Sequence, residues 1–290
     1  MTTIHVPATS ANLGPGFDSL GLALTLDLAV TIGQPQTHWQ IDHQLGRTVA
    51  NNQDNLIVKT ALALIPDLTP HYLHLRTNIP FACGLGSHSA LIIAGIELAD
   101  YLGKLSLSQF DKLQLATKLK GHPDNVAPAI YGGFVAATYD GFEAEIIQAP
   151  FPPARILAYI PPEQLSAQKS RGVLPAALPL RAAVASSSAA NVLVGALFRG
   201  DLELAGRMLE RDQFHETYRR RLAPNLVKIR HCAAQAGAYG TYLSGSGPAI
   251  LSLVPPKQVS TILATLMQLH LPGHWLNLTA APVGVTVSPQ

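Results

Sequence analysis

The chain has 290 residues, of which 48% are hydrophobic and 13% are charged, and its formal net charge is +2. This composition supports a sizeable buried core and argues against disorder. The densest basic run, Arg219–Arg221, is too short for a nucleic-acid surface. The two cysteines, Cys83 and Cys232, leave little room for a disulfide framework or a zinc site. We therefore expect a reduced, cytoplasmic protein with no nucleic-acid partner.

Neither the start of the chain nor its most apolar stretch indicates a membrane protein. Residues 1–5 lack the basic and apolar segments of a signal peptide. The uncharged stretch Ala182–Phe198 lies at the short end of the membrane-spanning range and contains three serines and Asn191. A buried helix is the better interpretation, and we expect no membrane partner.

Hydrophobic periodicity predicts the elements of the first half of the chain. Leu73 and Leu75 alternate with polar side chains, which is typical of a strand with one buried face. Gly121 follows a stretch of helical spacing and is expected to end that helix. The predicted strands are 3–8, 22–32, 71–78, 132–139 and 143–148, and the predicted helices are 89–102 and 108–120.

The stretch Pro150–Pro153 (PFPP) is the clearest break in the sequence, and we place a domain boundary there. The two predicted domains are 1–150 and 151–290. The second contains predicted strands at 155–160, 239–244 and 249–254, and predicted helices at 181–198, 201–209, 223–237 and 257–270. This mixture of strands and helices predicts an α+β fold.

Three glycine-rich loops are the strongest functional signal, at 7–18, 80–90 and 243–249. Glycine permits a positive φ and lets backbone amides approach a ligand closely. The second loop opens into a helix, whose free N–H groups can bind phosphate. It matches neither a Walker A loop nor a dinucleotide fingerprint. Alone, it fits a tight connection as well as a phosphate site, whereas the three loops together favour phosphate chemistry.

In this order the loops resemble the motifs of the GHMP kinase superfamily, and the resemblance covers essentially the whole chain. Segments 7–21 (PATSANLGPGFDSLG) and 121–129 (GHPDNVAPA) are similar to the homoserine kinases within it. The resemblance implies a two-domain GHMP kinase fold, with an N-terminal domain like ribosomal protein S5 domain 2, a ferredoxin-like C-terminal domain and ATP bound between them. It implies ATP-dependent phosphorylation of the homoserine side-chain hydroxyl, a step of threonine biosynthesis. Homodimers are common among such kinases, but no segment here specifies an interface.

A zwitterionic amino acid needs an anion for its ammonium group and a cation for its carboxylate. By resemblance, Asp18 binds the ammonium group, Arg171 and Arg219 bind the carboxylate, and His122 lies in the same pocket. Three of these residues have a plainer alternative. Asp18 can be a turn residue and His122 a capping residue, and Arg219 can be solvated like its neighbour Arg220.

By resemblance, the catalytic residues are Asn12, near the reacting hydroxyl, Asn125 and Arg171. Asn12 can instead simply bond its own loop. An amide such as that of Asn125 cannot accept a proton at neutral pH, so no dedicated base is expected. Phosphoryl transfer tolerates this because its loose transition state requires little early proton removal. The predicted nucleotide-binding residues are Asn55, Pro80, Gly84, Leu85, Gly86, Ser87, His88 and Ser89.

Two positions depart from the pattern of the homoserine kinases. His88 stands where they usually carry a serine that helps to hold Mg²⁺, and Lys120 stands near a position commonly occupied by glutamate. Neither replacement suits a hard cation, so we assign no metal ligand although ATP and Mg²⁺ are expected.

Three functions remain open at this point. The first is an active homoserine kinase in which phosphates and water hold Mg²⁺, while Lys120 or His88 offsets phosphate charge. The second is a reduced-activity or non-catalytic ATP or amino-acid binding relative. The third, a GHMP kinase for another small hydroxylated metabolite, is disfavoured by Asn125, Arg171 and Arg219.

Overall fold

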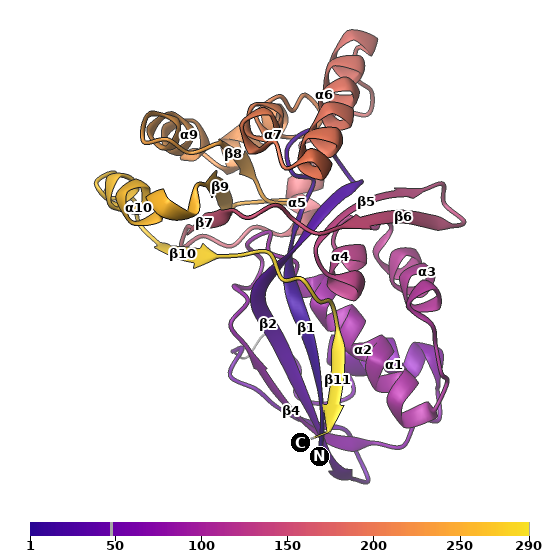
Figure 1. The fold of residues 1–290 in the computed structure, drawn as a ribbon. Helices are drawn as coiled ribbons and strands as arrows, with labels where there is room; N and C mark the ends of the chain where they lie inside the picture. Colours follow the sequence, from indigo (N-terminus) through magenta and orange to yellow (C-terminus); the bar gives the residue numbers. More distant parts are fainter. Residues whose placement is uncertain (47–48, 290) are drawn as a thin grey trace.

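The computed structural model describes residues 1–46 and 49–289, which form two β-sheets with associated helices (Figure 1). The first sheet has the order β11-β1-β2-β4-β3, and β5 pairs with both β2 and β6. Its strands are β1 (Thr2–Ala11), β2 (Leu20–Pro35), β3 (Gln40–Asp42), β4 (His71–Thr77), β5 (Phe134–Tyr139), β6 (Ala144–Ala149) and β11 (Thr286–Pro289). The β1–β2 register shifts between Pro7 and Ala8, as expected where a proline cannot donate to the ladder.

Four helices pack beside this sheet: α1 (Leu56–Leu64), α2 (Ser87–Gly103), α3 (Gln109–Lys120) and α4 (Val126–Tyr131). The central one is α2, which contacts α1, α3, α4 and β1 and is buried continuously from Ser89 to Ala99. An apolar helix buried on all sides is a core element rather than an amphipathic cover. Its N-terminus is therefore held rigidly where the second glycine-rich loop ends.

The second sheet is antiparallel, with the order β10-β7-β9-β8. Its strands are β7 (Arg155–Ile160), β8 (Gly240–Leu243), β9 (Ile250–Val254) and β10 (His274–Leu278). The helices of this half are α5 (Ala167–Arg171), α6 (Leu180–Arg199), α7 (Leu202–Leu209), α8 (Glu216–Arg219), α9 (Leu226–Gln235) and α10 (Val259–Met267), with 3₁₀ turns at Arg220–Leu222 and Pro256–Gln258.

The predicted α+β class is confirmed, and the predicted strands and helices are present with modest changes of boundary. Sequence periodicity missed β3, α1, α4, α5, α8 and the last two strands. One of these, β11, pairs with β1, so the two chain ends lie together at the foot of the first sheet (Figure 1). The C-terminal residues thus join the first sheet rather than the predicted 151–290 unit. The boundary near residue 150 stays a prediction.

The expectation of a buried helix at 182–198 is wrong for much of α6. The helix packs against α7 and buries a single stripe of side chains. The residues of this stripe are Ser186, Ala189, Leu193, Ala196 and Leu197. Leu180 is 79% exposed and Val184 is 57% exposed. By length and apolar composition α6 meets the criteria for a membrane span, but its spacing of buried residues is that of an amphipathic helix lying on a folded unit.

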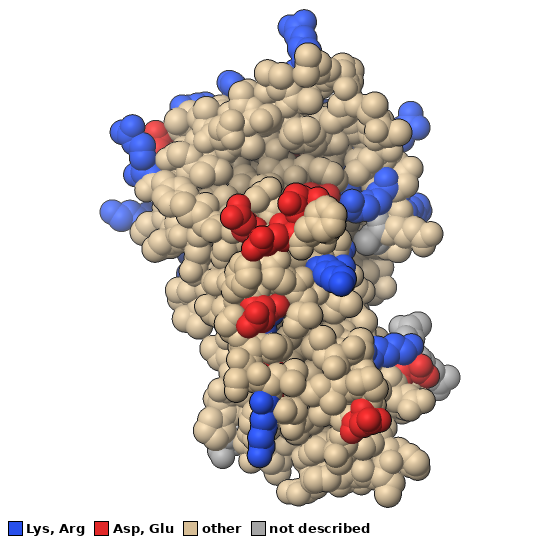
Figure 2. Space-filling view, turned by 90° about the vertical axis from the view of Figure 1, so that its right-hand side faces the viewer, with Lys and Arg blue, Asp and Glu red and all other residues tan. Residues whose placement is uncertain are grey.

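Charged side chains are sparse on the face shown in Figure 2, where acidic residues gather near the middle and Lys and Arg stand singly or in small groups. That face therefore lacks the continuous basic stripe that nucleic-acid binding requires. The three glycine-rich loops, in contrast, converge inside the molecule at the ends of β1 and β8 and at the start of α2.

Candidate active site

Close backbone packing locks the three glycine-rich loops together. Gly84 has a φ of +84°, and a Cβ there would lie 2.3 Å from the Ser244 carbonyl oxygen. Gly86 has a φ of +74°, and a Cβ there would lie 2.1 Å from Thr9 Oγ1. In addition, the Ser244 hydroxyl donates a hydrogen bond to the Gly84 carbonyl oxygen at 2.6 Å. Both glycines are required by their conformation and by the contact that they make.

A cavity of about 300 Å³ opens beside the second loop and the start of α2. Its lining combines apolar side chains, which suit a flat ring, with hydroxyl groups and loop backbone. The lining residues are Phe81, Ala82, Gly84, Gly86, Ser87, His88, Ser89, Leu91, Lys120, Asn125, Leu165, Ser166, Gly245 and Ser246. This lining fits a nucleotide whose phosphates lie at the helix N-terminus.

Ser89 provides the most direct sign of a ligand in this cavity. Its side chain is 1% exposed, and its hydroxyl has no hydrogen-bond partner among the described residues. A buried hydroxyl without a partner costs free energy, and such groups in folded proteins usually have one. Because Ser89 lies in the first turn of α2, where backbone N–H groups also lack intrahelical partners, this end of the helix offers two kinds of donor to an anion.

A second, smaller cavity of about 60 Å³ adjoins the first. We call the larger one the nucleotide-side cavity and the smaller one the acceptor-side cavity, after the ligands that the sequence predicts for them. Lys120, Asn125, Gly245 and Ser246 line both. The remaining residues of its wall are Asn12, Phe17, Asp18, His122, Asp124, Arg171 and Arg219. The structure therefore brings the predicted catalytic and acceptor residues to one place, next to the predicted phosphate site.

Asn125 lies at the junction of the two cavities as the N-cap of α4. Its Oδ1 accepts a hydrogen bond from the Thr9 hydroxyl at 2.9 Å. The carbonyl end of the amide is thereby engaged, so the NH₂ group is the end available to a ligand. Asn125 can donate to a phosphoryl oxygen but offers no basic group.

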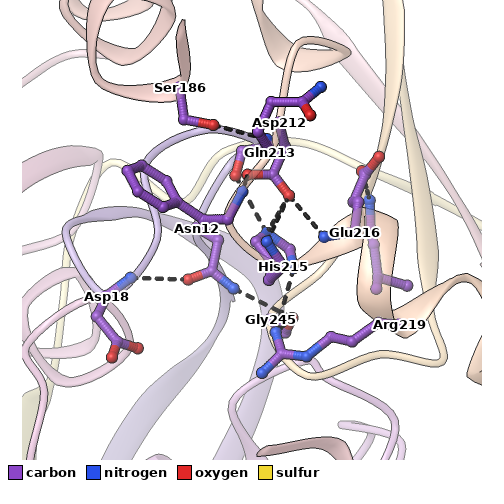
Figure 3. Close-up of polar contacts among 12 residues, drawn as sticks. Asn12, Asp18, Ser186, Asp212, Gln213, His215, Glu216, Arg219 and Gly245 are labelled. Atoms are coloured by element: carbon purple, nitrogen blue, oxygen red, sulfur yellow. Dashed lines mark hydrogen bonds and ion pairs between the residues drawn. The ribbon is translucent and has the colours of Figure 1, made fainter. Parts of the chain in front are cut away.

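Asn12 bonds its own loop, as the plainer alternative predicts, and it also lines the smaller cavity, whereas its catalytic role stays a prediction. Its φ is +70°, its Oδ1 accepts from the Asp18 N–H at 3.0 Å, and its Nδ2 donates to the Gly245 carbonyl oxygen at 3.1 Å. Figure 3 shows the amide bridging the first and third loops in this way. Asn12 thus makes the turn that shapes the acceptor cavity, and it also forms part of the wall of that cavity.

Asp18 and Arg171 face each other across the mouth of the smaller cavity. Arg171 Nη2 donates to both carboxylate oxygens of Asp18, at 2.8 and 2.9 Å. His122 is bonded through Nδ1 to Asp124 and lies 3.8 Å from Asp18. The ion pair is half-exposed, so its partners can separate at low cost and re-pair with the two ends of a zwitterion.

Arg219 is 2% exposed, so the solvated alternative for it is wrong. Its guanidinium donates to the Ser170 carbonyl oxygen at 3.3 Å and to the Gly245 carbonyl oxygen at 3.0 Å. The guanidinium also lies 5.5 Å from the centre of the Phe17 ring. Among the described residues, no carboxylate lies within 4.0 Å of it. Burial lowers its pKa from 12.5 to about 10, and the groups that hydrogen-bond Arg219 directly are all neutral.

Sequence reasoning missed the residues that hold this cation in place. His215 is fully buried, with Nε2 3.1 Å from the Gly14 carbonyl oxygen and Nδ1 3.1 Å from Arg219 Nη1. Burial lowers the pKa of His215, and the neutral ring can donate through Nε2 and accept through Nδ1. The Asp212 carboxylate caps α8 by accepting from the backbone N–H of His215 and Glu216 (Figure 3).

Three predicted nucleotide-binding residues do not lie on the wall of the nucleotide-side cavity. Asn55 is the N-cap of α1, where Oδ1 accepts from the Ile57 N–H at 3.0 Å and Nδ2 donates to the Ala50 carbonyl oxygen at 2.7 Å. Leu85 is fully buried, and its carbonyl oxygen accepts from the Thr9 N–H. Pro80 precedes the cavity wall. Asn55 thus caps α1 and Leu85 ties the second loop to β1, and only the remaining five predicted residues lie on the wall.

Comparison with known families matches the N-terminal domain of the GHMP kinases over residues 55–133 and their C-terminal domain over residues 193–270. The chain belongs to the GHMP kinase family. A homoserine kinase from Limosilactobacillus fermentum is 50% identical to it over 287 residues, which covers 98% of this chain and 99% of that relative.

Solved structures of this GHMP kinase fold agree with the assignment. One from Listeria monocytogenes is 41% identical and superposes with a TM-score of 0.91 over all of both chains. The homoserine kinase from Cytophaga hutchinsonii is 26% identical, with a TM-score of 0.85 over 99% of this chain and 97% of that one.

The GHMP kinase resemblance implies Mg²⁺, but the residues present do not fit an ion held by the protein. The wall of the nucleotide-side cavity contains no carboxylate and carries Lys120 and His88 instead. Asp18, His122 and Asp124 have ligand atoms within 4.8 Å of one another. However, these atoms already pair with each other and with Arg171. Magnesium prefers several free oxygen ligands, so we derive no step through it.

Proposed function

We propose that this protein is an ATP-dependent phosphotransferase that converts L-homoserine to O-phospho-L-homoserine. The observation that carries the proposal is Arg219, a buried cation without a carboxylate partner, facing the same small cavity as Asp18. A free amino acid brings the carboxylate that Arg219 lacks and the ammonium group that Asp18 can bind. The names of the curated relatives point to the same substrate.

The two cavities suggest how the reactants meet. ATP phosphates bind to the first turn of α2 and to the Ser89 hydroxyl. The amino acid is pinned by Asp18, Arg171 and Arg219, so that its side-chain hydroxyl points to the shared wall. This converts an encounter of two molecules into a reaction of two positioned groups.

The transfer itself relies on positioning and charge rather than on a base. The hydroxyl oxygen attacks the γ-phosphorus, and the bond from that phosphorus to the bridging oxygen breaks to release ADP. The Asn125 NH₂ group, which the bond from Thr9 turns toward the cavities, donates to the phosphoryl oxygens. The hydroxyl proton departs late in a loose transition state and passes to solvent, so no side chain has to remove it early.

The setting that we propose follows from this activity. The product is an activated amino acid of threonine biosynthesis, and the enzyme works in the cytoplasm.

A coupled assay of ADP release with homoserine, mevalonate, galactose and shikimate tests the function. We expect turnover with homoserine and little with the other three. Turnover with one of those three but not with homoserine would refute the substrate assignment.

A second candidate function is a non-catalytic binder of ATP or amino acids, and the observation that favours it is His88 and Lys120 on the phosphate side of the site. It predicts calorimetric binding of nucleotide or homoserine with no phosphohomoserine formed at any Mg²⁺ concentration. Product detected by phosphorus NMR eliminates this candidate.

A further inference from the structure

Lys120 lies on the wall that the two described cavities share, so its side chain can reach a ligand in either cavity. It is the last residue of α3 and is half-buried, and it lines the nucleotide-side and the acceptor-side cavity together. Asn125 and the third loop share this position but carry no charge. Lys120 is therefore the one charged residue of the described chain on the wall between the two cavities.

The Lys120 ammonium group is not used for structure. Among the described residues it has no hydrogen bond and no carboxylate within 4.0 Å. Burial is the largest effect on the pKa of Lys120 and lowers it, while the charges of Asp124 and Asp18 raise it. A partly buried ammonium group without a direct partner carries a desolvation cost that the counter-charge of a ligand offsets.

Lys120 could simply stabilise the C-terminal end of α3, but that role would not require a place on the wall of both cavities. A lysine in the last turn of a helix interacts favourably with the helix dipole. Lys118 lies in the same turn of α3 and is exposed, so it provides that interaction without lining either cavity. The location of Lys120 on both cavity walls is what remains to be explained.

We propose that the Lys120 ammonium group contacts the phosphoryl group during its transfer and supplies positive charge on the wall that both cavities share, where the described residues include no carboxylate for a divalent cation. The inference rests on the proposed kinase function. The bond from the γ-phosphorus to the bridging oxygen breaks while a bond to the acceptor oxygen forms. Lys120 stays protonated throughout and donates to the phosphoryl oxygens, whose charge it offsets. Such preorganised donors act strongly in a site that excludes water.

His88 does not compete for this role. Burial, followed by the positive charges of Lys120 and His122, lowers its pKa. A neutral imidazole beside the phosphates adds no charge, so Lys120 is the cation on which the phosphoryl group depends.

The test compares Lys120→Met with Lys118→Met, a matched change on the same helix turn outside both cavities. Calorimetry in the presence of EDTA measures the affinities for ADP and for the non-hydrolysable analogue AMP-PNP, which differ by the terminal phosphoryl group. A charge-assisted hydrogen bond predicts that Lys120→Met weakens AMP-PNP binding about 10- to 100-fold while ADP binding changes little. Lys118→Met should leave both affinities as they are.

Kinetics of the same variants provide the second readout. Lys120→Met should lower kcat about 100-fold, the scale of losing one preorganised donor, with the KM for homoserine within threefold of the parent. A kcat within twofold of that of Lys118→Met, or an equal loss of ADP and AMP-PNP affinity, would overturn the inference. If Lys120→Met does not fold, Lys120→Gln serves in its place.

This test separates the inference from the function on which it rests. The nucleotide comparison needs no acceptor, so it remains valid if homoserine is not the substrate. Absence of homoserine turnover in the parent protein would refute the proposed function, whereas full turnover in Lys120→Met would refute only the role of Lys120.

Discussion

Replacing Arg219 with leucine should destroy homoserine turnover without destabilising the protein, because the free protein holds this cation at a cost. Arg219 is 2% exposed and is bonded only to two carbonyl oxygens and the ring of His215. The decrease of its pKa from 12.5 to about 10 corresponds to a penalty of about 3 kcal/mol on the charged form.

Two opposing terms therefore determine the stability of Arg219→Leu. Removing the charge relieves the penalty of about 3 kcal/mol. Losing three hydrogen bonds, at about 1 kcal/mol each, offsets it. The free energy of unfolding should change by less than about 2 kcal/mol, and the melting temperature should shift by only a few degrees.

The effect on catalysis should be far larger. A substrate carboxylate left buried and unpaired costs about 2–5 kcal/mol, which lowers kcat/KM for homoserine about 30- to 5,000-fold. The KM for ATP should hardly change, because the guanidinium lines only the acceptor-side cavity. Steady-state kinetics with each substrate varied in turn, together with thermal melting, measure all three quantities.

Arg220→Leu is the matched control, since Arg220 is the exposed neighbour of Arg219. It should keep normal kinetics for both substrates. If Arg219→Leu raised the KM values for ATP and homoserine together, the guanidinium would serve the site as a whole and the reasoning from the substrate carboxylate would fail. A decrease in the free energy of unfolding of Arg219→Leu by much more than about 2 kcal/mol would refute the expected balance between the relieved charge penalty and the lost hydrogen bonds.

Two further predictions concern the supports of the site. Burial lowers the pKa of His215 below its usual 6.5, so the unfolded chain binds more protons there. The contribution of His215 to the free energy of unfolding should therefore be complete above pH 6.5 and fall as the pH drops below it, by up to about 1.4 kcal/mol per pH unit. Urea unfolding at a series of pH values measures this dependence. His215→Gln should flatten it, whereas the exposed His231→Gln should not. Gly86→Ala should cost about 1–3 kcal/mol, because its Cβ collides with Thr9. Gly195→Ala, in an open position of α6, should stabilise by about 0.5–1 kcal/mol, and differential scanning calorimetry compares the two.

The loops could be predicted from the sequence because the backbone conformations and hydrogen bonds that require their glycines and short polar side chains lie within the loops themselves. Gly84, Gly86 and Gly121 adopt positive φ values, and Asn12 bonds a backbone group six residues away. Requirements of this kind are visible in a motif. The same holds for the alternation that marked β4, where Leu73 and Leu75 are buried.

The supports of Arg219 could not be found in this way. His215 contacts a carbonyl oxygen 201 residues earlier in the chain, and no spacing in a single sequence reveals such a pair. Likewise, β11 pairs with β1 across nearly the whole chain. For α6, composition predicted burial, but the position of the helix at the edge of the molecule leaves one face exposed. Long-range packing, rather than local propensity, decides each of these cases.

The charges on the wall of the acceptor-side cavity suit an amino acid together with a second, anionic group. Its wall carries one more cation than carboxylates, apart from His122: Lys120, Arg171 and Arg219 against Asp18 and Asp124. A zwitterion is neutral and leaves that excess unchanged. In the binding that we propose, its ammonium group takes Asp18 from Arg171, and its carboxylate is then shared by Arg171 and Arg219. Only the incoming phosphoryl group, which is anionic, remains to neutralise the ammonium group of Lys120. The cavity is therefore electrostatically complementary to amino acid and phosphoryl group together, which is the arrangement of the transfer itself.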